Sequence, residues 1–254
     1  MRFRVSFVAS FVALTALALA CGVSAQAQSS STQAGPSPAT TTNGTYVTVD
    51  PLAKVTYDNR FDVSLGFAYD HMKAGPTLLQ GSNLGGLDLE GSYWLSKHWG
   101  VEGNVRAYAG TSGAGGNSAN ANFGNIKGPF VAEYMLLAGP EWLGPHNKHG
   151  ALIAHFLAGG TYGDFGRDLG APRLTGPNPD PNPFQAVDFY NTQIAPAAVI
   201  GGHIDLNRTA RWVFRITPDA VMTHYGINYP PNIKQFDVNF AISVGVEYKF
   251  KKKR

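Results

Sequence analysis

The last long segment of the chain, residues 236–250, alternates between apolar residues and polar or small ones. Its even positions, such as Phe240 and Ile242, are apolar, and its odd positions, such as Asn239 and Ser243, are polar or small. Strict period-two alternation predicts a β-strand with one apolar and one polar face. A length of about 15 residues is long for a soluble sheet, whereas a tilted strand that crosses a membrane needs about 9–11. The pattern therefore favours a membrane-spanning strand.

The same alternation recurs along the chain and predicts an all-β protein. The earlier segments that alternate are 61–69, 87–95, 101–109, 130–142, 151–162, 192–206 and 211–224. The connections are by turns long and short; the long ones are 71–83, 110–128, 163–191 and the stretch around Pro230, and 96–100 is one of the short ones. Short turns at one end and long loops at the other are typical of outer-membrane barrels. We therefore predict an eight-stranded antiparallel up-and-down transmembrane β-barrel.

The N-terminal region has the pattern of an export signal. Arg2 and Arg4 precede an apolar stretch that small residues follow, as in a cleaved signal peptide. Cys21, the only cysteine, is expected to be removed with it, and lipidation of Cys21 is the alternative. The next residues are rich in Ser, Thr and Pro and predict disorder. The predicted domains are a signal peptide at 1–27, a disordered periplasmic linker at 28–60, the barrel at 61–250 and a basic tail at 251–254.

Composition and charge narrow the class of protein further. Of the 254 residues only 15% are charged, and 30 are glycine, which departs from a typical soluble domain and suits a barrel. The formal net charge of +3 includes Arg2 and Arg4 of the leader, so the exported part is nearly neutral. We therefore expect no nucleic-acid partner, because such binding requires a basic patch.

The polar faces of the predicted strands carry many charges. A barrel of about eight strands has an interior that side chains fill, and unpaired charges are costly there. We therefore expect the arginines on these faces to pair with glutamates inside the barrel. The expected lumen charge network is Glu102, Arg106, Glu133, Glu141, Arg215, Asp219 and Glu247. A cation-conducting path is the alternative, since acids outnumber bases.

Aromatic residues cluster beside the short turns. Amphipathic rings at this level form an interfacial girdle in membrane barrels. The residues expected in the girdle are Tyr93, Trp94, Trp99, Trp142, Trp212, Tyr248 and Phe250.

The histidines give no catalytic motif. None lies in a His-x-Ser context or beside an acid on the lipid-facing side; His155 is expected to be a lumen hydrogen-bond partner, and His203 could pair with Asp205 on the same face. No His/Asp/Glu spacing repeats at ligand distance, and no Gly-rich stretch opens a helix. We therefore expect no catalytic residue, no metal ligand and no cofactor site, and not an enzyme.

The chain resembles the small outer-membrane β-barrel proteins of the OmpA/OmpX type, within the porin-like barrel domain family. The likeness lies in the export signal, the alternation and the ending Tyr248-Lys249-Phe250, with Gly139-Pro140 and Gly201-Gly202 as looser features. It implies that Tyr248 and Phe250 serve as an insertion signal for the barrel assembly machinery. It also implies a monomer in contact with outer-membrane lipids and lipopolysaccharide, located in the outer membrane of a Gram-negative-type cell.

Three functions are compatible with this reading. The first is an outer-membrane barrel with a structural or surface-interaction role. The second is a narrow porin-like channel for small polar solutes. The third is an exported soluble barrel that resembles a lipocalin and would turn its apolar residues inward to bind lipid.

Overall fold

The computed structural model of the chain describes residues 50–76, 78, 81–112, 128–169, 184, 188–229 and 232–250. The predictions for the signal peptide at 1–27, for Cys21 and for the tail at 251–254 lie outside the described residues. In the part of the chain that is described, no helix has the length and apolar character needed to cross a membrane.

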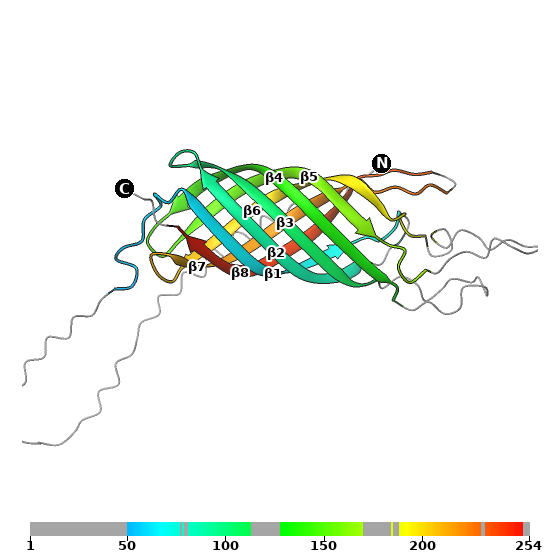
Figure 1. Ribbon diagram of the computed structural model, residues 1–254, viewed down its shortest axis with the longest axis horizontal. Coiled ribbons are helices and arrows are strands. Elements are labelled where there is room, and N and C mark those ends of the chain that lie inside the picture. Colours follow the sequence, from blue (N-terminus) through cyan, green and yellow to red (C-terminus); the bar gives the residue numbers. More distant parts are fainter. Residues whose placement is uncertain are drawn as a thin grey trace, which may run out of the picture. The chain divides into compact units, whose positions relative to one another are not determined.

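Eight antiparallel strands form one closed barrel (Figure 1). Each strand pairs with its neighbour in the sequence, and β8 pairs with β1 to close the sheet. The strands are β1 (Phe61–Met72), β2 (Ser82–Trp94), β3 (Trp99–Ser112), β4 (Phe130–His146), β5 (Gly150–Asp164), β6 (Gln193–Asn207), β7 (Trp212–Thr223) and β8 (Asp237–Lys249). The predicted fold class is confirmed.

The connections differ in part from the prediction. The first loop is shorter than 71–83, because Met72 of β1 still pairs with Ser82 of β2. The pattern missed the first residues of β2, because Gly85 and Gly86 place no side chain on either face and so interrupt the alternation. The strand β3 likewise continues to Ser112, into the predicted loop 110–128.

The side chains alternate across the barrel wall as the sequence pattern predicts. Phe67 in the middle of β1 is 79% exposed, whereas Asp62 and Asp70 on the same strand are buried. The last strand follows the same rule, with Asn239 and Ser243 buried. Apolar residues thus cover the outside and polar residues line the inside. This arrangement excludes the lipocalin-like alternative, which needs apolar residues inside.

Apolar side chains fill the two ends of the interior. At the short-turn end, Leu143, Ala151 and Ile153 form a small cluster against Tyr57 and Trp94. At the long-loop end a larger cluster includes aromatic rings of the segments that connect the strands, namely Phe165, Phe189, Tyr190, Tyr225 and Tyr229. Charged side chains fill the interior between these clusters and also reach the short-turn mouth.

Residues 50–60 lie against the short-turn end, although the sequence pattern placed them in a disordered linker. The Tyr57 hydroxyl donates to the Asn147 carbonyl at 3.0 Å and accepts from Asn207 Nδ2 at 2.7 Å. The Lys249 ammonium lies 4.4 Å from the centroid of the Tyr57 ring. One half-buried aromatic residue, Tyr57, holds this segment against the barrel, and a single residue has no periodicity for a pattern to detect.

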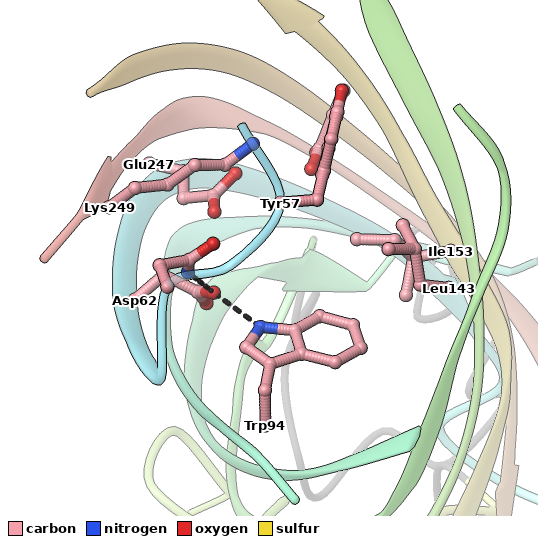
Figure 2. Close-up of a pocket in the computed structure, with 9 residues that line it drawn as sticks. Tyr57, Asp62, Trp94, Leu143, Ile153, Glu247 and Lys249 are labelled. Atoms are coloured by element: carbon pink, nitrogen blue, oxygen red, sulfur yellow. Dashed lines mark hydrogen bonds between the residues drawn. The ribbon is translucent and has the colours of Figure 1, made fainter. Parts of the chain in front are cut away.

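Most of the predicted girdle lies on the outside of the barrel. Tyr93, Trp99, Trp142, Trp212 and Phe250 are exposed. Trp94 is an exception, and its prediction was wrong. Its indole Nε1–H donates to Asp62 Oδ2 at 2.7 Å inside the mouth of the barrel (Figure 2). The physical reason is the strand period: Tyr93 points outward, so Trp94, the next residue, points inward.

Candidate functional site in the barrel lumen

Arg215 on β7 is the centre of one group of lumen charges. Its guanidinium binds both oxygens of Asp205, with Nε–Oδ1 at 2.8 Å and Nη2–Oδ2 at 3.0 Å. Nη2 also lies 3.0 Å from Glu247 Oε2, and Nη1 lies 3.1 Å from Glu90 Oε2. Asp205 and Glu247 come from the neighbouring strands β6 and β8, whereas Glu90 reaches across from β2. One buried cation thus pairs with three buried acids.

Arg106 on β3 is the centre of a second group. Its Nε lies 3.5 Å from Asp88 Oδ1, its Nη2 lies 2.5 Å from Asp219 Oδ2, and its Nε–H donates to Asn104 Oδ1 at 2.9 Å. The expected glutamate partners were wrong for this arginine. Asp88 occupies the position directly opposite Arg106 on β2, so the shorter aspartate side chain is within reach.

The other predicted members of the network are buried but do not contact an arginine. Glu133 Oε1 accepts from the Tyr225 hydroxyl at 2.8 Å and from Thr161 Oγ1 at 3.2 Å. Glu141 Oε2 accepts from Ser92 Oγ at 3.1 Å. Hydroxyl groups therefore take the place that the sequence analysis assigned to arginine. Of the four expected glutamate partners, Glu247 alone forms an ion pair with an arginine among the described contacts.

Two histidines and a glutamate meet in the middle of the lumen. Glu102 Oε2 lies 2.9 Å from His155 Nδ1 and 3.1 Å from His203 Nε2, and the two ring nitrogens are 3.2 Å apart. The outer nitrogens also have partners: His155 Nε2 lies 2.9 Å from Asp219 Oδ1, and His203 Nδ1 lies 2.9 Å from Thr217 Oγ1. We call Glu102, His155 and His203 the lumen triad.

The suggested pair of His203 with Asp205 is not what the structure contains. Both side chains point inward, but Asp205 binds Arg215 and His203 joins the lumen triad. His155 is a lumen hydrogen-bond partner. Strand parity showed that these groups face inward, but it could not show which of them meet across the lumen.

A glycine makes room for this arrangement. Gly201 on β6 pairs with His155 on one side and with Asp219 on the other. A Cβ atom at Gly201 would overlap the Asp219 carboxylate and the Pro218 carbonyl. The close approach of His155 to Asp219 therefore requires glycine at this position.

Replacing Gly201 with alanine is expected to destabilise the barrel by about 1–3 kcal/mol, the usual cost of overpacking an interior. The matched control is Gly103→Ala on the outer face of β3, where an added Cβ meets nothing closer than 4.0 Å. That change should stay within about 0.5 kcal/mol. Urea unfolding of the detergent-folded protein measures both, and equal values would contradict the proposed steric role of Gly201.

A small cavity lies at the short-turn mouth of the lumen. Its volume is about 10 Å³, which is room for about one water molecule. Trp94, Asp62, Glu247, Lys249 and Tyr57 converge on it (Figure 2). The mouth is thus lined by charged groups and by the aromatic rings of Trp94 and Tyr57.

The two residues of the expected insertion signal lie on the outer side of the barrel, at its short-turn end. The ring of Tyr248 is 4.9 Å from that of Trp212 and 5.0 Å from that of Phe250, and its hydroxyl accepts from Arg211 Nη1 at 3.2 Å. A role of Tyr248 and Phe250 in insertion stays a prediction.

Comparisons with known proteins reveal similarity to solved barrels. No protein-family description and no curated protein matches the chain. Among solved structures, OprG from Pseudomonas aeruginosa has 13% identity and a TM-score of 0.46, covering 78% of this chain and 99% of that one. Ail of Yersinia pestis has 16% identity and a TM-score of 0.42, covering 76% and 99%. Outer membrane protein W of E. coli has 14% identity and a TM-score of 0.37, covering 76% and 98%. The expected eight-stranded antiparallel barrel is confirmed by the strand order of the chain itself.

Proposed function

We propose that the protein is an integral barrel of the outer membrane that stays closed to ions and has a structural or surface-interaction role in the cell envelope. The observation that carries this proposal is a lumen filled by buried charged side chains, in which Arg106 and Arg215 are each held by more than one acid. Buried charges that hold one another across an interior act as a plug, because separating them would leave each without a partner.

The outer surface supports the membrane location. Soluble monomers rarely expose contiguous apolar patches of more than a few hundred Å², whereas apolar residues at least one third exposed occur on every strand here. Examples from six strands are Leu65, Leu89, Val105, Leu136, Phe156 and Ile200. The strands are also long enough to cross a bilayer, which takes about 9–11 residues for a tilted strand. Hydrocarbon is the environment that fits such a surface.

The long-loop end supports the closed state. Tyr225 extends from the end of β7 into the barrel, where it binds Glu133, and its ring lies 5.0 Å from that of Phe165. The Tyr190 hydroxyl donates to Asp237. These contacts place aromatic side chains over the charged residues of the lumen. The long-loop end, through which a solute would have to enter, is therefore filled by side chains. The segments at this end are the surface we assign to interaction with partners.

Planar-bilayer recording tests the closed lumen. We expect no resolved conductance steps from the wild-type protein, because a path through the lumen would have to separate the Arg215 ion pairs. Heat-modifiable migration of the same preparation on gels verifies that the barrel is folded. Arg215→Ala is the comparison, since it removes the side chain at the centre of the plug. Cation-selective steps from the wild type would overturn the proposal in favour of the narrow porin-like channel.

A further inference from the structure

We propose that the lumen triad of Glu102, His155 and His203 is a binding site for one divalent transition-metal ion of the zinc class. Its three potential ligand atoms, a carboxylate oxygen and two imidazole nitrogens, lie within 2.9–3.2 Å of one another. The side chains are fully buried. They come from β3, β5 and β6, so the rigid barrel wall fixes their positions.

The outer nitrogens of the two rings determine what the inner ones present. His155 Nε2 faces the Asp219 carboxylate, which can only accept. His203 Nδ1 faces Thr217 Oγ1, whose own hydroxyl donates to Glu90 Oε1 at 3.4 Å. Each ring therefore carries an N–H at its outer nitrogen. In the neutral imidazole the inner nitrogen then holds a lone pair, so two lone pairs and an anionic oxygen face one another.

A metal ion at the centre would satisfy all three acceptors. At zinc–ligand distances of about 2.0–2.1 Å, ligand atoms lie about 3.3 Å apart in a tetrahedral site, and the observed spacing is close to this value. Imidazole ligands suit zinc and neighbouring transition metals, whereas calcium and magnesium prefer sites made of oxygen. The donor set therefore selects the zinc class.

The surroundings of the triad have the features of a built metal site. Histidine ligands usually donate the other ring N–H to a carboxylate, carbonyl or similar acceptor, which fixes the tautomer and the ring orientation. Asp219 and Thr217 hold these positions here. The second oxygen of the glutamate, Glu102 Oε1, accepts no hydrogen bond from the described residues, so it is free to share in coordination.

The charge of the lumen also favours a cation. Among the described residues, ten buried acids face three buried permanent cations, Arg106, Arg215 and Lys249. The ten acids are Asp62, Asp70, Asp88, Glu90, Glu102, Glu133, Glu141, Asp205, Asp219 and Glu247. A divalent ion at the triad would reduce this excess between the two arginine groups, since His155 contacts Asp219 of one group and Thr217, the partner of His203, contacts Glu90 of the other. The sequence analysis expected no metal because the three ligands are far apart in the chain.

Metal analysis of the full-length barrel tests the proposal. The protein is folded into detergent in the presence of Zn²⁺, passed over a chelating resin and analysed for bound metal. We expect about one Zn²⁺ to remain per barrel, since a buried site with three protein ligands exchanges poorly. Folding with Co²⁺ in place of Zn²⁺ should give the visible absorption of a nitrogen- and oxygen-coordinated ion, and Mg²⁺ should not compete.

Two variants and one control locate the ion. His203→Gln should reduce the retained metal at least tenfold. Thr217→Val, which removes the acceptor for His203 Nδ1–H and leaves the triad intact, should weaken Zn²⁺ binding about 10- to 100-fold. The control is His146→Asn with His149→Asn, which removes two histidines of an exposed turn and should leave the retained metal unchanged. Heat-modifiable migration verifies that each variant is folded.

Two results would overturn the site. One is a wild-type barrel that retains no Zn²⁺ and shows no Co²⁺ spectrum. This result would mean that hydrogen bonds from protonated ring nitrogens, and not a metal ion, join Glu102, His155 and His203. The other is loss of the retained metal in the control for the exposed histidines. If His203→Gln does not fold, the wild-type stoichiometry, the Co²⁺ spectrum and the Thr217→Val variant still decide between these outcomes.

Discussion

Replacing Arg215 with methionine is expected to destabilise the barrel by about 3–5 kcal/mol, the largest effect of a single lumen substitution. The change leaves the Asp205, Glu90 and Glu247 carboxylates buried around a group that cannot pair with them. Breaking a buried ion pair by removing one partner has this cost because an uncompensated charge stays in the interior. Urea unfolding of the detergent-folded protein measures the free energy.

The control for this variant is Arg208→Met, which removes an exposed arginine from the turn that precedes β7. It should change the free energy of unfolding by no more than about 0.5 kcal/mol. Adding Asp205→Asn and Glu247→Gln to Arg215→Met should restore part of the stability, because both acids then become neutral. The account fails if Arg208→Met and Arg215→Met have the same effect.

Replacing Phe67 with arginine is expected to lower the stability of the barrel in a lipid bilayer by about 2–4 kcal/mol, the cost of a lipid-facing arginine at the membrane midplane. Phe67 lies in the middle of β1 and is 79% exposed. Its ring thus contacts the surrounding medium rather than the barrel interior. Reversible folding into phospholipid vesicles, followed against denaturant concentration, measures the effect.

The matched control is Phe61→Arg, at the first residue of the same strand, with 53% of its surface exposed. A charge near the interface costs only about 0–1 kcal/mol, so the two variants should differ. In water both would replace an exposed ring with a charge and neither would lose stability. Equal, small effects in vesicles would therefore contradict the membrane location of the outer surface.

The sequence alone predicts most of the barrel because the strand period is visible in most segments, the segment 192–206 with Pro196 and Gly201 being the least regular. Residues such as Phe67 and Asp62 alternate cleanly, so the number of strands, their order and the direction of their side chains follow from the pattern. Prediction fails at the strand ends, where Gly85 and Gly86 have no side chain that could show the period. It also fails for Tyr57, whose place depends on contacts with distant turns.

The candidate site is harder to predict because its members meet across the lumen. The alternation of side chains along each strand places Glu102, His155 and His203 inside. Whether they meet depends on how far β3, β5 and β6 are shifted relative to one another along the barrel. Gly201 shows the same limit: it reads as a weak point in a strand, and only the structure reveals that it accommodates the Asp219 carboxylate. The aspartate partners of Arg106 are likewise set by register and side-chain length, not by composition.

The contact between Glu90 on β2 and Arg215 on β7 has a consequence for assembly. These strands are not neighbours in the sheet, so their side chains meet only after β8 has joined β1. Until that seam forms, a growing sheet would present unpaired ionic groups to the lipid, where they are strongly disfavoured. Partly built intermediates can already hold the pairs between neighbouring strands, such as Arg215 with Asp205, whereas closure adds the pairs of Glu90 with Arg215 and of Asp219 with Arg106. Seam formation should accordingly be the step that completes the ionic contacts of the lumen.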